Sequence, residues 1–385
     1  MSEMSYLEKL LDGVEVEWLP LGEVSALRRG RVMSKGYLTE NFGPYPVYSS
    51  QTANNGKIGS INTFDFDGEY ISWTTDGANA GTVFYRTGKF SITNVCGLIT
   101  LKSKYPLIYK FLFYWLTIEA KKHVYSGMGN PKLMSHQVEN IPVPIPCPDN
   151  PEKSLAIQSE IVRVLDKFTA LTAELTAELN MRKKQYNYYR DQLLSFKEGE
   201  VEWKTLGTFA DNFDSLRKPI TSGLRETGNI PYYGASGIVD YVKDYIFDDD
   251  LLLISEDGAN LIARNTPIAF SISGKTWVNN HAHVLKFKNY TEQKFVEYYL
   301  NNINLTPYIS GAAQPKLNKK NLESIRIPNP SLKEKERIVT ILDKFDTLTN
   351  SITEGLPREI ELRQKQYEYY RDLLFSFPKP ETVSN

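Results

Sequence analysis

Few segments of this sequence combine the residue types and the spacing that phosphate or metal binding requires. Ser273-Gly-Lys-Thr276 resembles the end of a phosphate-binding loop, but Ala269 stands where that motif has its earlier glycine, so we interpret the segment as a turn. His281 and His283 are spaced so that both could lie on one face of a strand. As metal ligands they lack a nearby cysteine or acidic third ligand, and we expect no metal site.

Candidates for acid catalysis and for methyl transfer are also weak. Asp76 and Asp257 each precede a glycine, and an Asp-Gly pair is typical of a turn. No glycine-rich methyl-donor loop is present, and Asn130-Pro-Lys132 departs from an Asn-Pro-Pro-aromatic site after its first proline. We therefore expect a binding protein with no catalytic residue of its own.

The composition describes a folded chain with almost no net charge. The 385 residues include 45 Lys or Arg and 46 Asp or Glu, which gives a net charge of -1 and by itself argues against nucleic acid. An apolar fraction of 41% can form cores, and the length predicts two or three domains. The two cysteines are not paired as CxxC, no apolar run could span a bilayer, and the first residues are acidic. We expect a cytoplasmic protein that does not enter membranes.

The strongest signal is an internal duplication. Short motifs recur at an offset of about 180 residues, whereas the sequence between them has diverged. The matched pairs are Glu15-Val-Glu-Trp18 with Glu200-Val-Glu-Trp203, Asp76-Gly-Ala-Asn79 with Asp257-Gly-Ala-Asn260, Pro131-Lys-Leu133 with Pro315-Lys-Leu317, SLAIQSEIVRVLDKF with SLKEKERIVTILDKF, and KQYNYYRDQLLSF with KQYEYYRDLLFSF. One ancestral unit is therefore used twice.

Each repeat consists of a variable block, a proline-rich connector and a helical block. The predicted domains are an N-terminal helix that closes the repeat (1–13), a first variable domain (14–150), a central helical spacer (151–198), a second variable domain (199–330), a distal helical spacer (331–378) and a tail (379–385). The variable blocks alternate short apolar runs with Gly and Asn clusters, which predicts α+β domains.

The helical blocks predict two long helices. Apolar residues recur at spacings of 3 and 4 in both, from Ile161 to Leu175 and from Ile338 to Ile352, which is typical of coiled-coil seams. Because a whole domain lies between them in the chain, we expect them to pack antiparallel. Pro357 should break or kink the second helix.

The arrangement of two diverged blocks and two similar helical blocks resembles the specificity subunit of a type I restriction-modification system. The resemblance covers nearly the whole chain. It is closest to the enteric type IC group through the segments MSEMSYLEKLLDGVEVEWLPLGE, IPCPDNPEKSLAIQSEIVR, LDKFTALTAELTAELNMRKKQYNYYRDQLLSF and QYEYYRDLL.

This resemblance implies a non-catalytic subunit of a larger enzyme. Each variable block would be a target recognition domain in one major groove of double-stranded DNA, so that the chain reads an asymmetric bipartite target. The helices would bind two methyltransferase (M) subunits, and restriction (R) subunits would join through them. S-adenosylmethionine, ATP and magnesium would belong to those partners, with no cofactor in this chain. The alternatives are a two-lobed scaffold without nucleic acid and a self-contained DNA-modifying enzyme.

In this family the tetrapeptide TAEL acts as a ruler, and here it occurs at residues 172–175 and 176–179. One repeat adds about 6 Å of helix, which is more than the rise of about 3.4 Å per base pair. It also adds about 40° of rotation, which is comparable with the twist of one base pair. An added repeat should therefore lengthen the gap between the two half-sites. Without the family, TAEL also fits an ordinary helix.

Polar loop residues are the candidates for DNA contact, because amides can read adenine, Arg and Lys can read guanine, and Ser, Lys and backbone amides can hold phosphate. In the first domain they are Arg28, Arg29, Arg31, Ser49, Ser50, Gln51, Asn54, Lys57, Asn79, Asn130 and Lys132. In the second they are Ser236, Asn260, Arg264, Asn279, Asn280, Gln314, Lys316 and Lys319. Each of them could equally be a solvated turn or cap residue.

Aromatic and arginine side chains of the helical blocks are the candidates for partner binding, because these types anchor most interfaces. They are Tyr186, Tyr189, Arg190, Tyr367, Tyr370 and Arg371. The alternative is that the tyrosines pack the two helices against each other.

Overall fold

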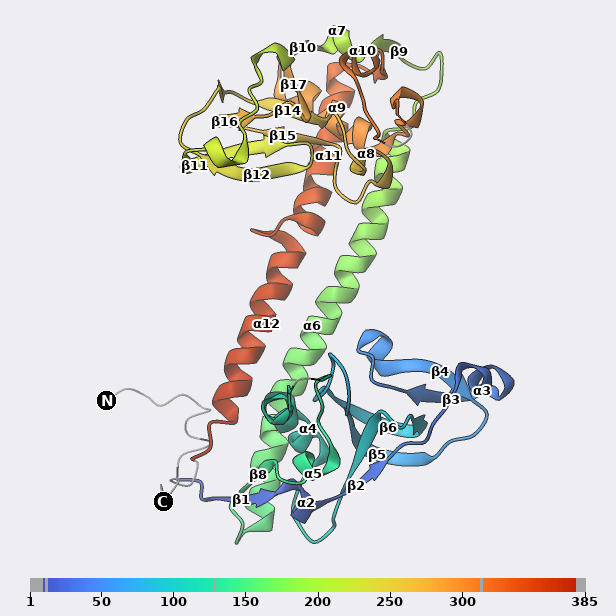
Figure 1. The fold of residues 1–385 in the computed structure, drawn as a ribbon, viewed down its shortest axis with the longest axis vertical. Helices are drawn as coiled ribbons and strands as arrows, with labels where there is room; N and C mark the ends of the chain where they lie inside the picture. Colours follow the sequence, from blue (N-terminus) through green and yellow to red (C-terminus); the bar gives the residue numbers. More distant parts are fainter. Residues whose placement is uncertain (1–9, 11–12, 128, 312–313, 379–385) are drawn as a thin grey trace. The chain divides into compact units, whose positions relative to one another are not determined.

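The computed structural model describes residues 10, 13–127, 129–311 and 314–378, and it divides into two compact units (Figure 1). Unit 1 comprises Met1–Glu174 and Ile360–Asn385, and unit 2 comprises Leu175–Glu359. The expected N-terminal helix at 1–13, apart from Leu10 and Gly13, and the expected tail at 379–385 lie outside the described residues. Within the described residues no helix is both long enough and apolar enough to cross a membrane.

Unit 1 is built on one six-stranded sheet. Its strands, in spatial order, are β2 (Ser25–Arg29), β7 (Cys96–Leu101), β5 (Phe66–Thr74), β6 (Val83–Ile92), β3 (Phe42–Tyr48) and β4 (Lys57–Ile61). The proline-rich connector forms β8 (Pro142–Pro146), which pairs antiparallel with β1 (Val16–Pro20). Prolines favour extended chain but have no backbone N–H to donate. Both strands of a two-stranded ribbon are edge strands, where this lack of a donor is tolerated.

Unit 2 repeats this path with two four-stranded sheets. One has the order β10 (Ala210–Asn212), β17 (Ala282–Phe287), β14 (Leu251–Ser255) and β15 (Ala269–Ile272), and the other has the order β12 (Gly237–Val242), β11 (Thr227–Gly234), β16 (Lys275–Val278) and β13 (Phe247–Asp248). The second connector forms β18 (Arg326–Asn329), which pairs with β9 (Glu202–Thr205). The run LLLIS forms β14, which is buried along its whole length between two neighbours.

The two units differ in whether the central strands are continuous. In unit 1, β5 and β6 pair without interruption through Gly68 opposite Gly88, and both glycines have positive φ. At the matched point unit 2 has breaks between β13 and β14 and between β15 and β16, where Gly274 also has a positive φ. Glycine thus allows the same bend within a continuous strand in one unit and between two strands in the other.

Matched helices cover the sheets and join them to the long helices. Helix α4 (Tyr109–Glu119) and helix α9 (Tyr290–Asn302) contribute buried aromatic residues to the two cores. The Tyr114 hydroxyl donates to Asp166 at 2.6 Å in unit 1, and the Tyr298 hydroxyl donates to Asp343 at 2.6 Å in unit 2. The duplicated sequence therefore forms duplicated contacts.

The long helices also pair in a matched way within each unit. They are α6 (Pro151–Leu193), α11 (Leu332–Asn350) and α12 (Gly355–Leu374). In unit 1, Phe168 of α6 stacks on Tyr370 of α12 with ring centroids 5.4 Å apart; in unit 2, Phe345 of α11 stacks on Tyr189 of α6 at 5.7 Å. These are the same two repeat positions with their helices exchanged, as a pseudo-two-fold repeat requires. The predicted α+β class and internal repeat are confirmed.

The second long helix is interrupted slightly before the expected position. Helix α11 ends at Asn350, and α12 begins at Gly355, which places Pro357 in the first turn of α12, where proline is tolerated. Ile352 lies in the interruption with 79% of its surface exposed. Its expected place in the apolar seam was therefore wrong.

The remaining helices are short. The α-helices are α2 (Leu21–Val24), α3 (Lys35–Glu40), α5 (Ser135–Val138), α7 (Leu206–Phe209), α8 (Asn260–Ala263) and α10 (Lys319–Glu323). The 3-10 helices are η1 (Ala53–Gly56), η2 (Ala120–His123), η3 (Asp214–Leu216), η4 (Ser222–Leu224) and η5 (Thr306–Tyr308).

Candidate nucleic-acid interface

Three polar segments of unit 1 lie side by side and form what we call the unit 1 loop cluster. They are residues 49–57, 76–79 and 126–132, of which 128 is not described. The Gly77 amide donates to the Pro131 carbonyl at 3.0 Å, and the Asn79 side-chain amide donates to the Ser50 carbonyl at 3.1 Å. Segments that are far apart in the sequence thus form one polar surface.

Unit 2 has a matching arrangement, the unit 2 loop cluster. It consists of residues 234–237, 256–260, 279–281 and 310–316, of which 312–313 are not described. The Gly258 amide donates to the Pro315 carbonyl at 3.1 Å, as Gly77 does to Pro131 in unit 1. The Ser255 hydroxyl donates to the Ala235 carbonyl and ties the first two segments together. The repeated DGAN and Pro-Lys-Leu motifs therefore meet in both units.

The Pro-Lys-Leu loop is held from the core in both units, by different side chains. In unit 1 the Trp73 indole N–H donates to the Leu133 carbonyl at 3.0 Å. In unit 2 the His283 Nε2 contacts the Leu317 carbonyl at 2.6 Å. Gly97 pairs with Trp73, and a Cβ at Gly97 would lie 2.0 Å from the indole ring. The indole therefore fills the space that a side chain at position 97 would need.

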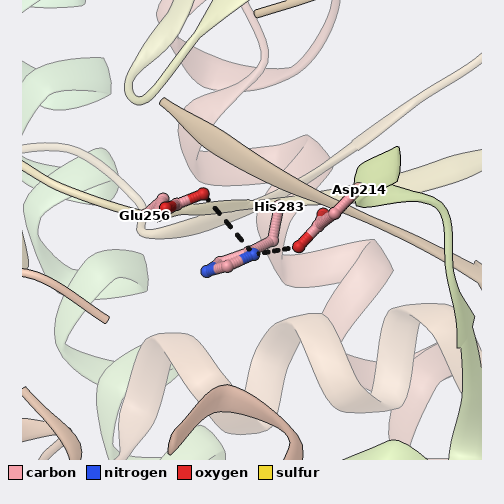
Figure 2. A group of neighbouring side chains, drawn as sticks. All are labelled: Asp214, Glu256 and His283. Carbon is pink, nitrogen blue, oxygen red and sulfur yellow. Dashed lines mark hydrogen bonds and ion pairs between the residues drawn. The ribbon is translucent and has the colours of Figure 1, made fainter. Parts of the chain in front are cut away.

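Two carboxylates, Asp214 and Glu256, lie beside His283, as Figure 2 shows. Its Nδ1 lies 2.6 Å from Asp214 and 3.8 Å from Glu256, and the imidazole is 1% exposed. The Arg217 guanidinium contacts Glu256 at 2.6 Å and Asp214 at 3.5 Å, and Lys316 of the loop contacts Glu256 at 3.2 Å. Two carboxylates thus contact basic side chains from three different segments of unit 2.

These partners shift the ionisation of both carboxylates. Burial alone raises the pKa of Asp214, but hydrogen bonds from His283 and from the Val284 amide, with the charge of Arg217, outweigh burial and lower the pKa. Burial likewise raises the pKa of Glu256, and Arg217, His283 and Lys316 lower it overall. Both groups are therefore stabilised as carboxylates.

The possible ligand atoms of Asp214, Glu256 and His283 lie within 4.8 Å of one another, close enough to hold a metal ion. The expectation that no acidic group accompanies the histidine was wrong, because folding brings in two carboxylates from distant segments. However, Nδ1 of His283 lies 2.6 Å from an Asp214 carboxylate oxygen, and Nε2 lies 2.6 Å from the Leu317 carbonyl oxygen, so both ring nitrogens already have partners. Arg217 also contacts both carboxylates, so each candidate ligand group is already engaged within the protein, and the absence of a metal stays a prediction.

The structure uses several of the predicted DNA-contacting side chains internally. In unit 1, Ser49 bonds Thr93, Gln51 donates to the Lys57 carbonyl, and Arg31 pairs with Asp65 at 3.0 Å. In unit 2, Asn260 bonds Thr266 through both side-chain atoms, and the Asn279 side chain accepts from the His281 amide. Lys319 contacts Glu323 at 3.7 Å.

Other predicted residues point outward. Among the described residues, no side-chain partner is found for the exposed Arg28, Arg29, Asn54, Lys57, Asn130 and Lys132 of unit 1, or for Ser236, Asn280 and Gln314 of unit 2. Ser50 is half-buried, and its carbonyl accepts from Asn79. Arg264 lies elsewhere in unit 2, where it donates to the Asn301 carbonyl at 3.2 Å and lines a cavity with Tyr186 and Arg190.

The predicted partner-binding tyrosines take part in helix packing. Tyr186 packs near Phe345, and burial raises its pKa to about 12. Tyr367 packs against the unit 1 core, and Tyr189 and Tyr370 stack as described above. Arg190 pairs with Asp191 at 2.8 Å, and Arg371 pairs with Asp372 at 2.7 Å.

Sequence reasoning missed the exposed tyrosine beside each stacked one. Tyr188 is 61% exposed and Tyr369 is 65% exposed, and each makes an edge-to-face contact with its neighbour at 5.4 and 5.3 Å. Their matched positions in the repeat could have identified them together. Which tyrosine faces outward, however, depends on the helical phase that the packing sets.

Comparisons with known proteins agree with the duplicated architecture. A family model described as the type I restriction modification DNA specificity domain matches residues 13–182 and again residues 198–362. The chain is 44% identical to the specificity subunit of the type I restriction enzyme EcoR124I/EcoR124II of Escherichia coli, with all of both chains covered. It is 41% identical to the EcoprrI specificity subunit of Escherichia coli, which covers 92% of this chain and 93% of that one.

A solved structure has the same fold. The crystal structure of the S subunit of a type I restriction-modification system from M. genitalium aligns with a TM-score of 0.65 and 18% identity, covering 98% of this chain and 100% of that chain. The full-length identities confirm the resemblance to the enteric type IC group. This chain therefore belongs to the family of type I restriction-modification specificity subunits, which determine the DNA target of these enzymes.

Proposed function

We propose that the chain reads an asymmetric bipartite DNA sequence, with one half-site for each unit. The observation that carries this proposal is the pair of loop clusters, each built around a Pro-Lys-Leu loop that is held from the core. A duplicated polar surface on two diverged units suits two different short sequences joined in one target.

The outward-pointing side chains of the clusters supply the chemistry of recognition. The amides of Asn54, Asn130 and Gln314 can pair with an adenine edge in the major groove. Lys57 and Lys132 of the unit 1 loop cluster, with Arg28 on β2, can hold phosphates and fix the orientation of the duplex. The near-zero net charge agrees with weak DNA binding by the chain alone, with partner subunits supplying positive surface around the duplex.

The partners would be two M subunits, one for each helical block, with R subunits joining through them. Exposed Tyr188 and Tyr369 stand at matched positions and provide two similar aromatic anchors. S-adenosylmethionine, ATP and magnesium would be bound by those partners, and the assembly would work in the cytoplasm. Changing both tyrosines to alanine should weaken assembly with M subunits, as measured by analytical ultracentrifugation, without altering the fold.

The direct test is to assemble the chain with its M subunits and to map methylated adenines across a genome. We expect one asymmetric motif with two specific parts separated by a fixed gap. Asn130→Ala with Lys132→Ala should relax one part, and Gln314→Ala should relax the other, while Lys333→Ala on α11 serves as a surface control. A single uninterrupted motif would contradict the proposal, and an assembled complex without sequence preference would favour the scaffold alternative.

The TAEL repeats allow a separate test of the spacing. Both repeats lie within α6, which is one continuous helix from Pro151 to Leu193. Inserting a third TAEL after Leu179 should lengthen the non-specific gap and leave both half-sites unchanged. Altered half-site bases in the methylation map would refute the ruler role.

A further inference from the structure

Arg86 is an arginine buried inside unit 1. It lies on β6 with 2% of its surface exposed. Its Nε donates to the Ser72 hydroxyl at 3.0 Å, and its Nη1 donates to the Asn55 carbonyl at 2.8 Å. The guanidinium carbon lies 3.6 Å from the ring centroid of Tyr48 and 4.4 Å from that of Phe84, so two aromatic rings contact it as well.

This placement is unfavourable for stability by itself. Among the described residues no carboxylate lies within ion-pair distance of Arg86, and its Nη2 is buried without a hydrogen-bond partner. Burial lowers the pKa of Arg86 to about 10, so the group still carries its charge near neutral pH. A buried cation without an opposite charge costs folding free energy, and such a cost is often retained for function.

Unit 2 builds the same fold without this arginine. The strand register pairs Tyr70 with Arg86 in unit 1 and Leu251 with Ile272 in unit 2, so Ile272 is the counterpart of Arg86. Arg86 contacts the rings of Tyr48 and Phe84 in unit 1, whereas their counterparts Tyr233 and Phe270 pack on each other at 6.1 Å. An apolar residue therefore satisfies the fold at this position.

Arg86 contacts the partly exposed segment at residues 49–57 from its buried side. Asn54 and Asn55 both adopt left-handed backbone conformations, with φ of 49° and 54°. The carbonyl of Asn55 accepts from Arg86, and a Cβ at Gly56 would lie 3.0 Å from Nη2. The guanidinium thus stabilises a sparsely populated backbone conformation from the buried side of the segment, while Asn54 and Lys57 of the same segment are exposed.

We propose that Arg86 is a positioning residue that sets the specificity of unit 1 for its DNA half-site, by fixing the shape of residues 49–57 against the duplex. This inference rests on the proposed function. A buried side chain would thus contribute to the discrimination between bases in the half-site of unit 1, without contacting the DNA itself. Unit 2 does not use this device.

The test replaces Arg86 by the residue of unit 2. Arg86→Ile would be assembled in the full chain with M subunits, and methylation rates would be measured on duplexes with single base changes in either half-site. Discrimination at the half-site of unit 1 should fall about tenfold, the range that one well-made base contact provides. Discrimination at the other half-site should not change. The unfolding temperature should be equal or higher, because a buried unpaired charge is removed.

Further variants separate positioning from folding. Arg86→Lys keeps the charge and one donor and should recover part of the discrimination. Gly56→Ala keeps the arginine but disturbs the same segment, because its Cβ would lie 3.0 Å from Nη2, and it should affect the same half-site. Ile272→Val is the matched control in unit 2 and should leave both half-sites unchanged. If Arg86→Ile proved unstable, Arg86→Lys and Gly56→Ala would still report on the loop.

The outcomes distinguish this inference from the proposed function. If the parent complex depends on two half-sites and both keep their discrimination in folded Arg86→Ile, the role of Arg86 is overturned and the function stands. Equal losses at both half-sites would also overturn it. A parent complex that depends on one uninterrupted sequence would contradict the proposed function and this inference with it.

Discussion

Units 1 and 2 hold the same loop carbonyl with chemically different side chains. Trp73 donates an uncharged indole N–H to Leu133, whereas His283 donates to Leu317 from within a network of carboxylates and cations. The two donors also come from neighbouring strands: Trp73 pairs with Gly97, and Ile254 pairs with His283. The ring that donates to the loop therefore comes from β5 in unit 1 and from β17, the counterpart of β7, in unit 2.

The matched loop carbonyl is therefore held in both units, although the residue that holds it differs. The loop segments carry the exposed Lys132 and Gln314, which are the side chains proposed to meet DNA. Divergence of the two interiors then changed how each unit depends on charge. Matched backbone hydrogen bonds hold the loop in both units, and the side chains that add to them are an uncharged indole in unit 1 and an ion-paired network in unit 2.

His283→Ala should have the largest effect on stability. It removes the imidazole that lies between the half-buried Asp214 and Glu256. Both carboxylates keep Arg217 as a partner, so we expect a loss near the lower end of the about 3 to 5 kcal/mol that breaking a buried ion pair costs. Chemical denaturation of the chain, with hydrogen exchange assigned to unit 2, would measure the loss. His283→Gln can still donate to Leu317 and should be less damaging; equal losses for both variants would deny any role to that hydrogen bond.

Gly97→Ala should destabilise unit 1 by about 1 to 3 kcal/mol or more, because its Cβ would overlap the Trp73 ring. The loss would appear as faster hydrogen exchange in β5 and β7. A compensating variant tests the cause: Trp73→Ile introduces the residue that unit 2 has at the matched position, and together with Gly97→Ala it should restore part of the stability. No recovery in the double variant would mean that the overlap is not the source.

Trp73→Phe should cost about 1 to 3 kcal/mol, because it leaves the buried Leu133 carbonyl without its donor. The change should be local, with faster exchange at residues 126–133. Trp115→Phe is a matched control, since that indole donates to the Pro142 carbonyl at 2.7 Å and not to the loop. Equal loop exchange in the two variants would contradict a specific role for Trp73.

The features predicted correctly from the sequence are those that repeat or have a clear period. The duplicated motifs indicated that DGAN and Pro-Lys-Leu segments belong to equivalent units, and the spacing of apolar residues predicted the long helical blocks. These signals are local, because each depends on neighbouring residues or on a second copy of the same sequence.

The interior groups could not be predicted in this way. Asp214 reaches His283 across 69 residues, and nothing near either residue indicates the other. Arg86 stands in the run VFYRTGKF, where a charged residue suggests the exposed face of a strand. Its burial follows from the way β5, β6 and β3 come together, and the sequence period does not encode that arrangement. The same limit explains why the exposed tyrosines were not distinguished from the packed ones.

The smallest predicted effect is a difference between the units in their response to acid. The folded-state pKa values of Asp214 and Glu256 are lowered. A carboxyl group of this kind contributes stability above its unfolded pKa, which is about 4 for both residue types, and loses that contribution as pH falls through the folded value. The hydrogen bond of Trp73 has no titrating member. Between about pH 5 and pH 3, hydrogen exchange corrected for its intrinsic rate should therefore increase at residues 310–311 and 314–317 more than at residues 126–127 and 129–133. Asp214→Asn should reduce this difference, because one of the two titrating groups is then absent. An equal response of the two loops in the parent protein would show that the charged network does not govern how unit 2 holds its loop.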